Sequence, residues 1–227
     1  MNEDKAMANP DGSMQLQKLR FDTDTAVREL MFLVRPDATF GNLTVGGPCD
    51  IECTKLRDAV YALKPVGGSG PHYFFPYVQA GGGGVGHCLV PSGAAVGTLV
   101  ITGGMNGCSL EVRSRGSDLM FMHDANGSSL AGLGNGDVRR SGDVLCRADA
   151  RGYMNPYEHN LVRTICERST SHSDVGSVPV HSLITVKTIN GWKVVHSGVF
   201  EITTMAGTKK TESYERIPTI SDLVGRF

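Results

Sequence analysis

Long apolar runs, a surplus of either charge and paired-cysteine motifs are all missing from this 227-residue sequence. No run approaches the roughly 18 apolar residues of a transmembrane helix. The first 30 residues contain no apolar segment like that of a secretory signal peptide. The formal net charge is −1, which gives no electrostatic reason to expect binding to nucleic acid or to a membrane. We therefore expect a protein made in the cytoplasm that binds neither.

The cysteines are too sparse for a small disulfide scaffold, and no Cys-x-x-Cys pair occurs. We expect six free thiols: Cys49, Cys53, Cys88, Cys108, Cys146 and Cys166. A zinc site from the cysteines at 49 and 53 with nearby histidines is disfavoured by this spacing. Gly81-x-Gly83-x-x-Gly86 matches a dinucleotide fingerprint in letters, but Pro91 follows too soon for the helix that this motif must open. We expect no metal and no cofactor.

What the sequence has in excess is glycine, at 29 residues against an ordinary share of roughly 7%. Together with many short runs of β-branched and aliphatic residues, this favours a β-rich fold. Asn190-Gly191 is a strong hairpin signal. Turn residues bound the expected strands at 99–102, 109–112, 119–123, 143–148, 182–189 and 192–200.

Helices are expected to flank this core. Apolar residues at a period near 3.6 predict a helix over 50–63, ended by Lys64-Pro65. A second helix is predicted over 157–168, a short strand over 16–21, and a helix or strand over 26–34. Residues 1–15 are polar and predict a flexible lead. The expectation is an α/β (α+β) fold: one domain over 16–227, with a β-sandwich-like core of mainly antiparallel strands.

Chemistry is suggested by Cys108, in a glycine-containing turn, and His123, fifteen positions later at the end of the next strand but one. An antiparallel pair of strands would bring the two side chains together, and a histidine that takes the thiol proton makes a cysteine nucleophilic. Asn106-Gly107 fits a tight turn whose backbone N–H groups would form an oxyanion hole. A buried structural cysteine and histidine remain the alternative. His181 and His196 flank the hairpin and would either pair across it or lie on a solvated face.

The segment around the pair resembles the catalytic core of the cytotoxic necrotizing factor family of bacterial toxins and of Burkholderia lethal factor. That family has Leu-Ser-Gly-Cys where this chain has Met105-Asn106-Gly107-Cys108. Met122-His123-Asp124 is similar to the family's histidine strand. Thr102 matches a threonine associated with the site of Burkholderia lethal factor, which implies a role in orienting His123.

The resemblance implies deamidation of a glutamine side chain in a host protein, through a thioester on Cys108, or transglutamination by the same route. It also implies a monomeric toxin or effector that is made in a bacterial cytoplasm and is secreted or injected to act in the host cytosol. Another thiol hydrolase, such as a peptidase or amidase, stays open as an alternative. So does a β-sandwich that only binds a partner.

Overall fold

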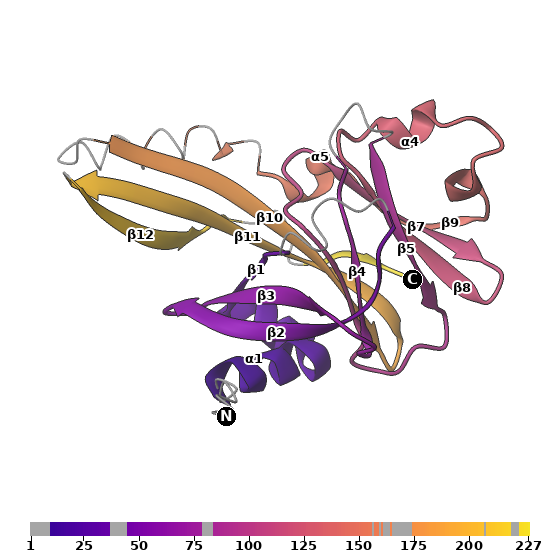
Figure 1. The fold of residues 1–227 in the computed structure, drawn as a ribbon, viewed down its shortest axis with the longest axis horizontal. Helices are drawn as coiled ribbons and strands as arrows, with labels where there is room; N and C mark the ends of the chain where they lie inside the picture. Colours follow the sequence, from indigo (N-terminus) through magenta and orange to yellow (C-terminus); the bar gives the residue numbers. More distant parts are fainter. Residues whose placement is uncertain are drawn as a thin grey trace, which may run out of the picture.

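The structure is a computed structural model that describes residues 10–36, 45–78, 84–155, 157–158, 160, 164, 174–206, 208–218 and 223–227. Within these ranges two β-sheets pack face to face, and helices cover part of the larger sheet (Figure 1). This is the predicted α+β sandwich. Across the same ranges, no helix is both long and apolar enough to cross a membrane.

The larger sheet is mixed and has nine described strands. Their order is β1-β3-β2-β4-β6-β10-β11-β12. The ninth strand, β13, pairs with a different part of β11 from the part that pairs with β12. Two of the pairings are parallel, β1 with β3 and β4 with β6. The strands are β1 (Met31–Val34), β2 (Gly47–Arg57), β3 (Val60–Gly67), β4 (His72–Phe75), β6 (Leu99–Thr102), β10 (Asp174–Thr188), β11 (Gly191–Ala206), β12 (Lys209–Arg216) and β13 (Leu223–Arg226).

The smaller sheet is antiparallel, with the order β5-β8-β7-β9. Its strands are β5 (Val85–Pro91), β7 (Ser109–Arg115), β8 (Asp118–Asp124) and β9 (Val144–Ala148). Short helical turns lie in the connections that follow β8 and β9: α4 (Ser129–Gly132), η1 (Val138–Arg140) and α5 (Ala150–Tyr153). Every strand predicted between residues 99 and 148 is therefore confirmed.

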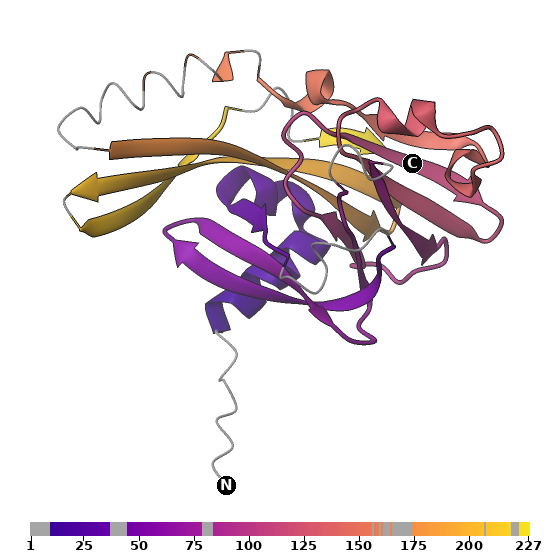
Figure 2. The ribbon, with the colours of Figure 1, turned by 45° about the horizontal axis from the view of Figure 1, so that its top comes forward.

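Successive side chains of each strand point to opposite faces of the large sheet, so the sheet has a separate hydrophobic core on each face. One face of β6 and β10 contributes Val100 and Leu183 to a core shared with Val112 and Phe121 of the small sheet. The opposite face of the large sheet packs against the two N-terminal helices, α1 (Pro10–Phe21) and α2 (Thr23–Glu29). Figure 2 shows these helices against the large sheet, away from the small one. The large sheet is thus buried on both faces where β6 pairs with β10.

The Asn190-Gly191 hairpin is confirmed. β10 and β11 pair antiparallel up to Thr188 and Gly191, so Ile189 and Asn190 form a two-residue turn. The hydroxyl of Thr188 accepts the Asn190 N–H and donates to the Gly191 carbonyl, which closes the turn. Away from this turn, β10, β11 and β12 extend beyond the sandwich as a blade (Figure 1).

The predicted helix over 50–63 is wrong, since these residues form the β2–β3 hairpin. Asp58 at the turn has a φ of 42°, a left-handed conformation that aspartate tolerates better than most residues. β2 also pairs with β4, and β3 with β1. Inter-strand hydrogen bonds on both sides therefore outweigh a helical period supported by only a few apolar residues.

The predicted strand over 16–21 is also wrong, because α1 runs through it. Pro10 starts this helix, where the missing N–H of proline is no loss. Residues 10–15, expected in the flexible lead, are helical as well. Residues 26–34 form the end of α2 and then β1. The predicted helix over 157–168 and the glycine loop before Gly84 lie mostly outside the described residues.

Candidate active site

Cys108 and His123 lie on one face of the small sheet. Ser109 pairs with Asp124 and Leu110 with His123, so Cys108, one residue earlier, stands opposite Ala125. The thiol donates to the Ala125 carbonyl over 3.1 Å, which agrees with this position. His123 is then the diagonal neighbour of Cys108 on the same face, a relation that leaves the two residues roughly 7–8 Å apart and within reach of a long side chain such as histidine. The cysteine's neighbours on that face belong to the core between the sheets.

A second pair in the structure has the same diagonal relation. His181 stands opposite Gly198, and Leu183 stands opposite His196, so His181 and His196 are related as Cys108 and His123 are. Their rings are hydrogen-bonded, with His181 Nδ1 2.8 Å from His196 Nε2. This geometry therefore brings side chains into contact in this fold. The alternative of a solvated face for these two histidines is wrong, because both are buried.

Thr102 is the residue that fixes the ring of His123. Its Oγ1 lies 2.7 Å from His123 Nδ1. Thr102 ends β6 in the large sheet, whereas His123 is on β8 in the small sheet, so the contact crosses the sandwich. Both residues are fully buried. The other ring nitrogen, Nε2, is buried without a hydrogen-bond partner among the described residues. Phe75 and Tyr77 flank the ring.

Burial sets the resting charge of both groups. It raises the pKa of the Cys108 thiol to about 11, with a further contribution from the Asp124 carboxylate. It lowers the pKa of His123 to about 3. At neutral pH the pair therefore rests as a thiol and a neutral imidazole. Proton transfer from sulfur to His123 would accompany attack on a substrate, as in general base catalysis.

The turn before Cys108 presents backbone N–H groups. Gly107 has a φ of +86°, a conformation that glycine adopts without strain. Within the described part of the chain, the N–H groups of Asn106 and Cys108 donate to no backbone acceptor, whereas the Gly107 N–H is directed at the Tyr153 hydroxyl. Two free amides in one turn, those of Asn106 and Cys108, can hold an oxyanion. The Asn106 side chain is engaged elsewhere, since its Nδ2 donates to Pro179 O on β10.

Asp124 and Asn126 are polar residues close to His123 in sequence, and their side chains bind the loop that follows β8. Asp124 projects to the opposite face of β8 and accepts the backbone N–H groups of Ser129 and Leu130. Asn126 Oδ1 accepts the hydroxyl of Ser129. Both side chains therefore order the loop after β8, which contains the Ala125 carbonyl that binds the Cys108 thiol.

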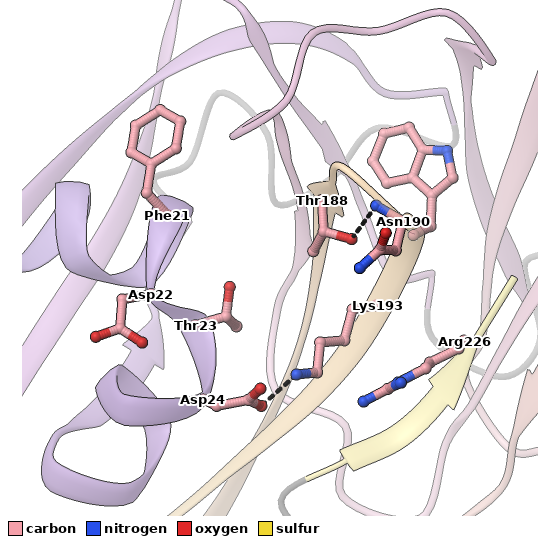
Figure 3. A pocket seen from close by; sticks show the side chains of 9 residues that line it. Phe21, Asp22, Thr23, Asp24, Thr188, Asn190, Lys193 and Arg226 are labelled. Atoms are coloured by element: carbon pink, nitrogen blue, oxygen red, sulfur yellow. Dashed lines mark hydrogen bonds and ion pairs between the residues drawn. The ribbon is translucent and has the colours of Figure 1, made fainter.

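A separate pocket of about 270 Å³ lies beside the start of α2 (Figure 3). Asp24 from α2 extends toward Lys193 on β11 and forms an ion pair with it, and Arg226 lies on β13. The lining residues are Phe21, Asp22, Thr23, Asp24, Thr188, Asn190, Trp192, Lys193 and Arg226. They include two acids, two bases and no cysteine or histidine, so this pocket offers no thiol–imidazole pair.

Other motifs add no site. In the described ranges, no group of three or more His, Cys, Asp and Glu side chains is arranged to hold a metal ion. Cys49 is buried and Cys53 half-buried, and both are free thiols. Gly86 lies inside strand β5 rather than at the start of a helix, so the glycine motif lacks the context of a dinucleotide site.

Comparison with known proteins finds likeness among solved structures. No protein-family model matches the chain, and no curated protein matches it. Among solved structures, the chain is similar to the crystal structure of the C-terminal domain of CNFy from Yersinia pseudotuberculosis, with 11% sequence identity and a TM-score of 0.34. That alignment covers 92% of this chain and 99% of the other. The inference of function therefore depends on the geometry around Cys108 and His123.

Proposed function

We propose that this protein is a cysteine-dependent deamidase that converts a glutamine side chain of a protein substrate to glutamate. One observation supports this most strongly. His123 is held at Nδ1 by Thr102 while its Nε2 is buried and unpartnered on the face that carries Cys108. A base in this state can accept one proton, and the thiol on the same face of the strand pair, which now donates to Ala125 O, is the group that would supply it.

The reaction would proceed in two halves. With its hydrogen on Nδ1, directed at Thr102, His123 accepts the Cys108 proton at Nε2 as sulfur attacks the carboxamide carbon. The oxyanion is held by the backbone N–H groups of Asn106 and Cys108. His123 returns the proton to the leaving nitrogen, which departs as ammonia and leaves a thioester. Water then attacks the thioester, its proton passes to Nε2, and glutamate and the thiol are released.

The resemblance noted in the sequence suggests the setting of this activity. A bacterial effector of this kind would reach the cytosol of a host cell by secretion or injection and act there on a host protein. A primary amine that displaced water at the thioester would make the product a cross-link instead of glutamate. Both reactions use the same three side chains.

The activity can be tested by incubating the protein with a mammalian cytosolic extract and measuring intact masses. Deamidation adds about one dalton per site without cleavage, whereas a peptidase with the same pair would give fragments. Cys108→Ser should abolish the change, and Cys53→Ser, a half-buried thiol on β2, should leave it intact. An unaltered extract, or equal activity of Cys108→Ser, would contradict the proposal.

Two substitutions at Thr102 test whether its hydrogen bond to His123 matters for catalysis. One removes the hydroxyl and keeps the side-chain volume, and the other keeps the hydroxyl. Thr102→Val keeps the volume but removes the partner of Nδ1, and we expect a rate loss of about 10- to 100-fold. Thr102→Ser keeps the hydroxyl and should retain most of the activity. If both variants lose activity equally, packing at Thr102 matters and its hydrogen bond to His123 does not.

A further inference from the structure

A buried chain of three titratable side chains lies behind the nucleophile turn and takes no part in the proposed reaction. Glu158 Oε2 lies 3.1 Å from His181 Nε2, and His181 Nδ1 lies 2.8 Å from His196 Nε2. All three side chains are buried. His196 Nδ1 has no partner in the described part of the molecule.

The bonding pattern assigns the hydrogens of this chain. Glu158 Oε2 accepts from His181 Nε2–H, which leaves His181 Nδ1 as an acceptor for the Nε2–H of His196. The remaining atom, His196 Nδ1, is then a bare lone pair, which matches its lack of a partner. Burial lowers the pKa of both histidines. At pH 7 both imidazole rings of this hydrogen-bonded row are therefore neutral, and the row can support the residues that pack on it.

Tyr153 connects this support to the nucleophile turn. Its ring centroid lies 5.6 Å from the centroids of both His181 and His196. Its single O–H is shared between Cys108 O, 2.7 Å away, and Met105 O, while its oxygen accepts the Gly107 N–H. Tyr153 is fully buried at the end of α5, and burial raises the pKa of its hydroxyl, which keeps it a donor.

The backbone of β10 holds the other side of the turn. Met105 N donates to His181 O over 2.8 Å. The Asn106 side chain bridges two groups of β10, donating to Pro179 O over 2.6 Å and accepting from His181 N over 3.3 Å. His181 therefore contributes to both supports of the turn. Its backbone hydrogen-bonds to the turn, and its ring belongs to the hydrogen-bonded row of Glu158, His181 and His196 that packs against Tyr153.

We infer that Tyr153 is a positioning residue for the nucleophile, acting through the two carbonyl groups that bracket the turn. A peptide plane fixed at its carbonyl is also fixed at its N–H, which points the opposite way. By holding the Met105 carbonyl, the hydroxyl fixes the Asn106 N–H of the same peptide plane, and by holding the Cys108 carbonyl it anchors the other end of the turn. This inference rests on the proposed function for its catalytic consequence, but the fixed turn is a structural property of its own.

The test compares Tyr153→Phe with Tyr61→Phe. Tyr61 is a matched control, since it is equally buried but its hydroxyl bonds to Asp11 on the helical side of the large sheet. Alkylation by iodoacetamide is followed at each cysteine by peptide mapping. We expect Cys108 to react at least about fivefold faster in Tyr153→Phe, because a freed turn opens more often. Cys49 and Cys88, both fully buried, should be unchanged.

Deamidation in the cytosolic extract should fall at least about tenfold in Tyr153→Phe, because displaced oxyanion donors lose their alignment. Unchanged Cys108 labelling would overturn the inference, as would faster labelling with undiminished deamidation. If the wild type deamidates nothing while the Cys108-selective change persists, the proposed function fails and the positioning role stands.

Faster labelling of every cysteine in Tyr153→Phe would mean general loosening. Asn106→Ala then decides, because its side chain is exposed and its removal leaves the core intact. It cuts both side-chain bonds to β10 while keeping the backbone N–H. If Asn106→Ala makes alkylation faster at Cys108 alone, the result supports the inference that contacts from outside the turn hold it in place. If Cys108 in Asn106→Ala is alkylated at the wild-type rate, the inference is overturned.

Discussion

His72 offers a way to measure how far buried neutral histidines determine the stability of this fold. It lies on β4 and is 4% exposed, and its Nδ1 accepts the backbone N–H of Leu99 over 3.1 Å. Burial lowers its pKa to about 4, with a smaller contribution from the charge of Arg20. His72→Asn is the informative change, since the amide oxygen takes the place of Nδ1 and does not titrate.

The expected magnitude follows from the two pKa values. In the unfolded chain His72 titrates near about 6.5, so at pH 5.0 it is mostly protonated there but still neutral in the folded protein. The unfolded state thus binds more protons, and stability falls as pH falls through this window. The loss between pH 7.5 and 5.0 is about 2 kcal/mol for His72. His123 and His196, with a pKa of about 3 each, add similar losses.

Together these losses are comparable to the whole stability of a typical domain, about 5–15 kcal/mol. The assay is urea unfolding at both pH values, followed by the fluorescence of Trp192, the one tryptophan, which is buried. His72→Asn will be less stable than the wild type at pH 7.5, and this difference should shrink by about 2 kcal/mol at pH 5.0.

Comparing the same variant at two pH values removes the cost of its altered packing. Tyr61→Phe changes a buried side chain that does not titrate in this range, so its difference from the wild type should be the same at both pH values. Equal differences for His72→Asn at pH 7.5 and 5.0 would refute the reasoning, since they would mean that His72 titrates alike in both states.

Two further changes test the turns. Gly191→Ala should destabilise by about 2 kcal/mol, measured as a lower Tm, because Gly191 has a φ of +115° and an added Cβ would meet Phe227 O at 2.7 Å; Gly47→Ala, where nothing lies within 4 Å, is the control. Asp124→Asn should lose about 1–3 kcal/mol, because two backbone amides of the following loop lose a charged acceptor. It should also move Cys108 alkylation to lower pH, since the Asp124 charge raises the pKa of that thiol.

The strands between residues 99 and 148 were predictable because their ends are determined locally. Glycine and other turn residues bound each one, and the register then follows from short turns. The 50–63 segment was not predictable in the same way. Ile51, Leu56, Val60 and Leu63 satisfy a helical period, but Ile51 and Leu63 are also buried positions of two paired strands. Only the neighbouring strands β1 and β4 decide between these structures, and they come from distant parts of the chain.

In the candidate site, too, contacts between residues close in sequence were predictable and contacts between distant segments were not. Cys108 and His123 lie on strands joined by one turn, so sequence separation alone predicts that they are close. The contact of Thr102 with His123 crosses between sheets and was suggested only by resemblance to a known family. No spacing predicts Tyr153, because its contact with the turn depends on where α5 packs after β9.

The pairing of His181 with His196 shows what local reasoning can and cannot supply. The dipeptide Asn190-Gly191 predicts the hairpin that joins them, so their proximity follows from the sequence. Their burial does not, because two of the residues that pack against them, Tyr153 and Glu158, come from the connection after β9. A histidine pair on a hairpin becomes a support for the nucleophile turn only when that connection covers it. Substitutions at Tyr153 should therefore act on Cys108 although some 45 positions separate the two residues in sequence.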